Sequence, residues 1–123
     1  MPPRVLVVDD LPMMRQALRD VIEEAGFVVA GEAIDGNQGI VAYMEHKPDV
    51  VLLDIVMPKL DGIAALKQLI RIDPGARVIM CSALGEQSLI FRAIQLGARD
   101  FIVKPFRPER VVESIRRVVS YAP

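Results

Sequence analysis

The sequence predicts an α/β fold, with one doubly wound sheet of five parallel strands flanked by five helices. Short runs rich in β-branched residues alternate with segments of helical periodicity, and each alternation has about the length of one βα unit. Most of the runs are apolar throughout, as expected for strands that helices cover on both faces. At 123 residues, the chain is expected to form a single domain over residues 1–123.

The five expected strands are residues 4–8, 28–32, 50–53, 77–81 and 100–103. The first expected helix has apolar residues at intervals of three and four over residues 14–25, with Pro12 near its start and Gly26 just past its end. The second, at about residues 37–46, has the weakest pattern because Gly36 and Gly39 lie in or beside it.

The last three helices are marked by caps or by apolar faces. Asp61 can cap the third helix, and residues 73–75 (Asp-Pro-Gly) end it. Pro108 begins the fifth helix. The apolar faces of the third, fourth and fifth helices consist, in turn, of Ile63, Leu66 and Ile70; of Ile90, Ala93 and Ile94, followed by Gly97; and of Val111, Val112, Ile115, Val118 and Val119.

Composition excludes several classes of protein. Fifteen basic and 16 acidic residues give a net charge of −1, so the overall charge provides no attraction to nucleic acid or to anionic lipid. No apolar stretch approaches the roughly 20 residues of a membrane span. Cys81 is the only cysteine, which excludes an internal disulfide, and no signal-peptide hydrophobic region follows the first residues. We therefore expect a cytoplasmic protein without membrane contacts.

Polar residues stand where the expected strands end. Asp9 and Asp10 follow the first strand, Asp54 follows the third, Ser82 the fourth and Lys104 the fifth. The carboxyl ends of parallel strands lie at one edge of the sheet, where ligands of open α/β sheets bind. Any one of these residues alone would more often be a turn former, a loop hydroxyl or a solvated charge. Together at one edge, they indicate a site.

The residue types of this expected site indicate metal-dependent phosphoryl chemistry. Carboxylates held close together repel one another, by about 4 kcal/mol for a pair at 4 Å and an effective dielectric near 20, so they need a cation. Oxygen ligands without Cys or His favour Mg²⁺. One aspartate could then become an aspartyl phosphate, while the metal, the lysine and the serine hydroxyl orient the phosphoryl oxygens.

Other readings of the same residues fit less well. A haloacid-dehalogenase-like phosphatase also uses an aspartyl phosphate, but it needs a second acid two residues after the nucleophile, where Val56 stands. A nucleotide-binding module would need a Gly-rich turn in place of residues 9–12 (Asp-Asp-Leu-Pro). Ser-His-Asp catalysis would depend on His46, which lies near the end of the second helix.

Four motifs, in order, resemble the receiver domain of two-component response regulators. They are residues 5–10 (Val-Leu-Val-Val-Asp-Asp), 53–58 (Leu-Asp-Ile-Val-Met-Pro) with Asp61-Gly62, 81–83 (Cys-Ser-Ala) and 104–106 (Lys-Pro-Phe). The resemblance covers essentially the whole chain and is greatest to stand-alone chemotaxis regulators of the CheY type. It implies a flavodoxin-like sheet with strand order 2-1-3-4-5.

The resemblance implies a role for each acidic residue. Asp54 would be the phosphoacceptor and, with Asp10, a direct ligand of Mg²⁺. Asp9 would act on the metal largely through water. The third protein ligand would be the main-chain carbonyl of Val56, which leaves its side chain free to vary.

The resemblance also implies how the site is completed and how it switches. Ser82 would supply the hydroxyl that is more often a threonine's in the family, and Lys104, joined to Pro105 by a cis bond, would match the family's lysine. Phe101 occupies the aromatic switch position without the hydroxyl of a tyrosine; a plain core aromatic is the alternative. Val56 and Leu84 are apolar where faster-hydrolysing relatives often carry polar groups, which implies a long phosphorylated lifetime.

By the same resemblance, the protein would catalyse only its own phosphorylation and dephosphorylation. A CheA-like sensor histidine kinase would phosphorylate it, and the fourth helix, fifth strand and fifth helix would bind the flagellar motor switch protein or another output partner. A phosphatase could be a further partner. A receiver excised from a longer regulator, with a DNA-binding or methylesterase output, is the alternative.

We expect a monomer that does not bind nucleic acid by itself. Basic residues of the fifth helix and its approach are mixed with acids, which is typical of a solvated helix face. These residues are Arg107, Arg110, Arg116 and Arg117, with Glu109 and Glu113 among them.

Overall fold

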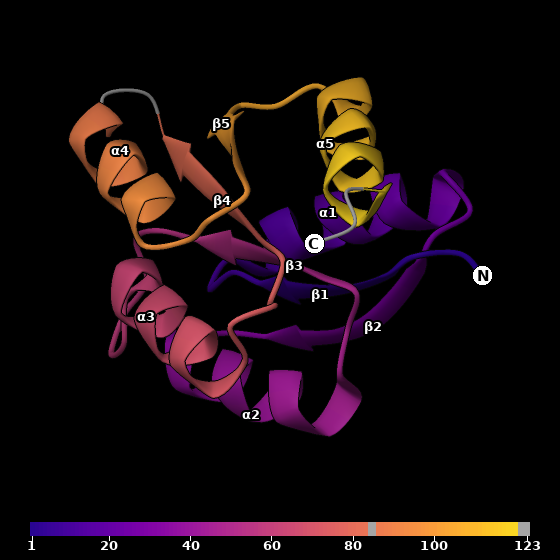
Figure 1. Ribbon diagram of the computed structural model, residues 1–123. Helices are drawn as coiled ribbons and strands as arrows, with labels where there is room; N and C mark the ends of the chain where they lie inside the picture. Colours follow the sequence, from indigo (N-terminus) through magenta and orange to yellow (C-terminus); the bar gives the residue numbers. More distant parts are fainter. Residues whose placement is uncertain (84–85, 121–123) are drawn as a thin grey trace.

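The computed structural model describes residues 1–83 and 86–120 and has the predicted α/β architecture (Figure 1). One parallel sheet has the strand order β2-β1-β3-β4-β5. Its strands are β1 (Arg4–Val8), β2 (Val28–Ala33), β3 (Val50–Asp54), β4 (Val78–Ala83) and β5 (Asp100–Lys104). The helices are α1 (Pro12–Glu24), α2 (Gly36–His46), α3 (Gly62–Ile72), α4 (Gln87–Gln95) and α5 (Pro108–Ser120). The flavodoxin-like fold and its strand order are confirmed.

Helices cover both faces of the sheet, with α1 and α5 on one face and α2, α3 and α4 on the other (Figure 1). Successive residues of a strand point to opposite faces. In β1, Leu6 and Val8 pack into the cluster under α2, α3 and α4, whereas Val5 and Val7 pack under α1 and α5. Both sets of side chains need to be apolar, which explains the absence of strict alternation in the strand sequences.

Helix starts follow the local sequence signals. α1 begins at Pro12, where a missing N–H removes no helical hydrogen bond. The carboxylates of Asp35 and Asp61 accept hydrogen bonds from main-chain N–H groups three residues later, at 2.8 and 2.9 Å. Asp61 is thus the predicted cap of α3, and the cap at Asp35 starts α2 at Gly36, one residue earlier than expected.

Four strands extend further toward the carboxyl edge than predicted. β2 ends at Ala33, β3 at Asp54, β4 at Ala83 and β5 at Lys104, rather than at residues 32, 53, 81 and 103. The ladder continues because the backbone still bonds between strands beyond the apolar runs: the N–H of Ile55 donates to the carbonyl of Cys81 at 3.0 Å. Asp54, Ser82 and Lys104 are therefore held by regular sheet backbone instead of loops. At the opposite edge, β4 begins at Val78, one residue later than expected.

The predicted apolar face of α4 is only partly covered. Ala93 is buried and Ile90 is half-buried, but Ile94 is 43% exposed and its neighbour Phe91 is 66% exposed. α4 lies toward the β5 edge of the sheet (Figure 1), where no further strand or helix of residues 1–83 and 86–120 covers its outer side. Among the residues that the structure describes, no helix has both the length and the apolar character needed to cross a bilayer.

Candidate functional site

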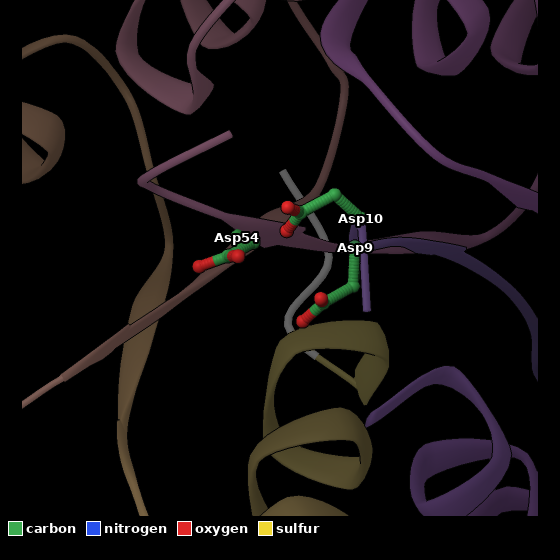
Figure 2. A group of neighbouring side chains, drawn as sticks. All are labelled: Asp9, Asp10 and Asp54. Atoms are coloured by element: carbon green, nitrogen blue, oxygen red, sulfur yellow. The ribbon is translucent and has the colours of Figure 1, made fainter. Parts of the chain in front are cut away.

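Three aspartates lie together at the carboxyl edge of the two central strands (Figure 2). Asp9 and Asp10 directly follow β1, and Asp54 is the last residue of β3, which pairs with β1. One carboxylate oxygen from each lies within 4.8 Å of the others. Asp9 is 1% exposed and Asp54 7%, whereas Asp10 is half-buried. Parallel topology therefore brings together the three acids that the sequence predicted to meet.

Lys104 reaches these aspartates from the end of β5. Its Nζ lies 3.0 Å from Oδ2 of Asp9 and 3.2 Å from Oδ1 of Asp54. We call the three aspartates together with Lys104 the acidic pocket. With every group charged, three carboxylates and one ammonium leave an excess of two negative charges (3 − 1 = 2).

The acidic pocket disfavours the charged form of Asp54. Burial raises the pKa of Asp54 to about 6; the carboxylates of Asp9 and Asp10 add to this rise, and the ammonium of Lys104 opposes it. Burial alone would lower the pKa of Lys104, but its bonds to Asp9 and Asp54 outweigh burial and raise it. A hard cation that binds oxygen ligands would relieve the repulsion among the carboxylates, so the residues present fit Mg²⁺.

Ser82, near the end of β4, has a hydroxyl whose hydrogen-bonding capacity is unused in the part of the chain that the structure describes. Its neighbour Cys81 is in register with Asp54 across β3 and β4. Ser82 is fully buried, and its Oγ has no hydrogen-bond partner among the described residues. A buried polar group without a partner costs about 1–3 kcal/mol, so a hydrogen-bond partner for this hydroxyl would be stabilising.

The structure describes three of the remaining predicted residues, Val56, Phe101 and Pro105. Val56 is 58% exposed in the segment after β3. Phe101 is half-buried; it packs against the cluster under α2, α3 and α4 and also lines an open groove with residues of α4. The bond between Lys104 and Pro105 is cis, as predicted. Leu84 lies outside the described residues.

α3 approaches the end of β3 very closely at Gly62. The N–H of Gly62 donates to the carbonyl of Ile55 at 2.8 Å. A Cβ on Gly62 would lie 2.1 Å from the main-chain oxygen of Asp54 and 2.7 Å from Cα of Ile55. Both distances are shorter than non-bonded atoms tolerate, so the backbone behind Asp54 requires glycine here.

Two of the arginines predicted on a solvated helix face, Arg110 and Arg117, have side chains 36% and 48% exposed and also bind a buried carboxylate, a contact that was not predicted. Asp100, the first residue of β5, accepts hydrogen bonds from Ser114 Oγ at 2.6 Å, from Arg110 at 3.3 Å and from Arg117. Both arginines lie on the side of α5 that meets β5, a position that charge spacing along the helix does not reveal. Arg116 is exposed and lies over the ring of Phe27, 5.7 Å from its centroid.

Sequence reasoning also missed Arg15. Its Nη1 donates to the main-chain carbonyl of Asp9 at 2.8 Å, and its Nε lies 3.4 Å from Oε1 of Glu32. The contact runs from α1 back to the end of β1. It depends on the path of residues 9–11 between the two elements, for which the sequence carries no spacing signal.

Known proteins resemble the chain in sequence and in structure. The family described as "Response regulator receiver domain" matches residues 5–116. The chain is 52% identical over 115 residues to the chemotaxis protein CheY of Thermotoga maritima, covering 94% of this chain and 96% of that protein. It is 50% identical over 117 residues to CheY of Bacillus subtilis, covering 95% and 98%.

A solved relative has nearly the same backbone. In the crystal structure of a CheX–CheY–BeF3–Mg²⁺ complex from Borrelia burgdorferi, one chain superposes with a TM-score of 0.92 at 38% identity, covering 96% of this chain and 90% of that chain. The matching family and relatives are receiver proteins and not conventional enzymes, which argues against the dehalogenase-like phosphatase. The chain belongs to the response regulator receiver-domain family and is a CheY-like chemotaxis regulator that is activated by phosphorylation.

Proposed function

We propose that Asp54 is the residue that becomes phosphorylated. The observation that carries this proposal is its buried carboxylate, 3.2 Å from the ammonium of Lys104 and within 4.8 Å of the other two acids. Asp9 is less available, because its Oδ1 accepts from the N–H of Leu11 and its Oδ2 from Lys104. Asp54 is contacted by Lys104 alone among the described residues, which leaves one carboxylate oxygen free to attack.

The chemical step that we propose is a direct transfer. A carboxylate oxygen of Asp54 attacks phosphorus and forms an acyl phosphate, while the bond from phosphorus to the donor's imidazole nitrogen breaks and its electron pair leaves with the imidazole. The ammonium of Lys104 stabilises the charge on the phosphoryl oxygens. The Oγ of Ser82, fully buried and without a partner among the described residues, donates to one of them.

Mg²⁺ is the cation that we propose for the acidic pocket. Asp10 and Asp54 would be direct ligands, with the main-chain carbonyl of Val56 as the third. Asp9 would act largely through water, since its carboxylate already accepts from Leu11 and Lys104. Bound there, the ion would neutralise charge on the carboxylates and on the phosphoryl group. The Mg²⁺ and BeF3 in the Borrelia complex support this assignment.

The switch that we propose runs from Ser82 to Phe101 across two paired strands. Ser82 is in register with Val103 and Met80 with Phe101 in the β4–β5 pair. A phosphoryl group on Asp54 would draw Ser82 toward it, and Phe101 would change its rotamer beside α4. Contacts made in only one of two states typically bias their equilibrium by about 1–3 kcal/mol.

The partners that we propose follow from the relatives. A CheA-like sensor histidine kinase would be the donor, in the cytoplasm, and the flagellar motor switch protein would bind the face formed by α4, β5 and α5. The presence of CheX in the Borrelia complex supports a phosphatase of that type as a further partner. We propose one stand-alone receiver domain, monomeric and without nucleic-acid binding; a receiver from a longer regulator is the alternative, and the length of the reading frame distinguishes the two.

Phosphorylation from a small donor tests the assignment of Asp54. With acetyl phosphate and Mg²⁺, we expect intact-protein mass spectrometry to detect one phosphoryl group that hydroxylamine removes, and we expect Asp54→Asn to abolish it. Asp61→Asn is the matched control, because asparagine caps a helix as well as aspartate does and position 61 lies outside the acidic pocket. Labelling that survives in Asp54→Asn would place the acceptor elsewhere.

A further inference from the structure

We infer that Arg15 is a positioning residue for the metal-binding pair Asp9 and Asp10. This inference rests on the proposed function, in which these two aspartates serve Mg²⁺. Arg15 lies in the first turn of α1, and its Nη1 donates to the main-chain carbonyl of Asp9 at 2.8 Å. The Arg15 side chain is only 17% exposed, so water competes little for this bond.

The carbonyl of Asp9 needs a donor from outside the sheet. Val8 is the last residue of β1 in register with either neighbouring strand. Asp9 still donates its N–H to the carbonyl of Ala33 at 3.1 Å, but in the described part of the chain its own carbonyl receives a hydrogen bond from Arg15 alone. Arg15 therefore fixes the peptide plane that joins Asp9 to Asp10.

That peptide plane matters most for Asp10. The Asp9 carboxylate has two anchors of its own, Leu11 and Lys104. The Asp10 carboxylate makes no hydrogen bond and no ion pair within residues 1–83 and 86–120, so its direction depends on its backbone. Removing a group that hydrogen-bonds to a metal-ligating residue and orients it typically lowers metal affinity 10–100-fold.

Arg15 is itself held in place by an ion pair with Glu32, and Arg19, which pairs with the same glutamate, provides a control. Glu32, on β2, forms ion pairs with Arg15 and with Arg19, one turn further along α1. Arg15 and Arg19 therefore share a helix and an ion-pair partner. Only Arg15 reaches the backbone of Asp9. A comparison of the two separates the effect on Asp9 from the effects of surface charge and of α1 packing.

Calorimetric titration with Mg²⁺ alone tests the inference. We expect Arg15→Ala to raise the dissociation constant for Mg²⁺ about tenfold. We expect Arg19→Ala to leave it within about twofold of the wild-type value. We expect Arg15→Lys to recover part of the loss, because an ammonium can still donate one hydrogen bond. Arg15→Met keeps the apolar part of the side chain but has no hydrogen-bond donor. We expect it to raise the dissociation constant as much as Arg15→Ala does, so it serves as the test if Arg15→Ala does not fold.

A second readout separates positioning from general destabilisation. The rate of phosphorylation by acetyl phosphate in Arg15→Ala should return to the wild-type value at saturating Mg²⁺, because Asp54, Ser82 and Lys104 are unchanged. Unchanged Mg²⁺ affinity in Arg15→Ala, or equal losses in Arg15→Ala and Arg19→Ala, would overturn the inference and leave the proposed function intact. Failure of the wild-type protein to bind Mg²⁺ would overturn both.

Discussion

Two buried aspartates, at opposite edges of the sheet, have opposite electrostatic surroundings. Asp54, at the carboxyl end of β3, shares one ammonium with two further acids, and burial raises its pKa to about 6. Asp100 begins β5 at the amino edge. Burial alone would raise the pKa of Asp100, but hydrogen bonds from Ser114 and Arg110 outweigh it and lower the pKa.

This contrast distinguishes a binding site from a structural tether. A cluster with too few positive partners gains most when a cation arrives from solution, and it loses little when one of its acids is neutralised. A carboxylate with several fixed donors gains nothing from a ligand and holds two elements together. Asp100 ties α5 to β5 in this way, and the same five-residue strand carries Lys104 at its other end.

Neutralising each aspartate should separate the two roles by the largest margin. At pH 7 without Mg²⁺, we expect Asp100→Asn to lower the free energy of unfolding by about 2–3 kcal/mol. The substitution breaks charge-assisted hydrogen bonds and leaves the former partners of the carboxylate without an ionic partner. We expect Asp54→Asn to raise it by about 0.5–1 kcal/mol, because it removes one of three repelling charges. Urea unfolding followed by circular dichroism measures both. A loss of stability in Asp54→Asn similar to that in Asp100→Asn would contradict the contrast.

A fall in pH should change the contributions of the two aspartates to folding stability in opposite directions. The folded-state pKa of Asp54, about 6, is raised above its ordinary value of 3.8, so the folded state binds this proton more tightly than the unfolded state. Acidification from pH 7 to pH 5 should therefore stabilise the wild type relative to Asp54→Asn, by about 1 kcal/mol after screening by solvent. Saturating Mg²⁺ should remove this difference. An unchanged difference between the two proteins across this range would argue against the raised pKa.

Asp100 provides the reverse case within the same titration. Its folded-state pKa lies below its ordinary value of 3.8, so its contribution to stability is present above that value and is lost as the pH falls through the lowered folded-state pKa. The wild type should thus lose its advantage over Asp100→Asn only below about pH 4. Both windows can be read from unfolding curves collected on the same pH series.

The smallest effect is expected at Val56, two residues after Asp54 in the chain. Val56 is 58% exposed and offers no polar group to a water molecule that attacks an acyl phosphate on Asp54. We expect Val56→Asn to speed autodephosphorylation several-fold, which corresponds to about 1 kcal/mol in the barrier. Val56→Leu is the matched control and should leave the rate unchanged. Loss of the phosphoryl group can be followed by mass spectrometry after the donor is removed; equal rates in the wild type and Val56→Asn would dispose of this prediction.

Most of the acidic pocket was predictable because topology determines it. Once the strands are parallel, residues such as Asp9, Asp54 and Lys104, which come last in their strands or just after them, have to share one edge. The extra strand residues at that edge were not predictable from apolar runs alone. Backbone hydrogen bonding, such as that between Ile55 and Cys81, extends the ladder whatever the side chains are.

The contacts of Asp100 and Arg15 were beyond sequence reasoning for a different reason. Each depends on how a helix is rotated and placed against the sheet, as when Arg117, although partly exposed, binds Asp100 of β5. Helical periodicity identifies the apolar face of α5, but it does not determine which charged residues beside that face meet a buried acid. The exposure of Phe91 on α4 similarly depends on the position of that helix near the sheet edge.

Position 62 tolerates few substitutions, although Gly62 contributes no atom to the chemistry. A methyl group there would lie 2.1 Å from the main-chain oxygen of Asp54, and the chain that carries this aspartate would have to shift to make room. In a mutational scan selected for signalling, position 62 should therefore be as intolerant of alanine as the acids themselves are of substitution. Replacing Gly62, the first residue of α3, with a better helix former in order to stabilise the helix would therefore impair phosphorylation of the protein.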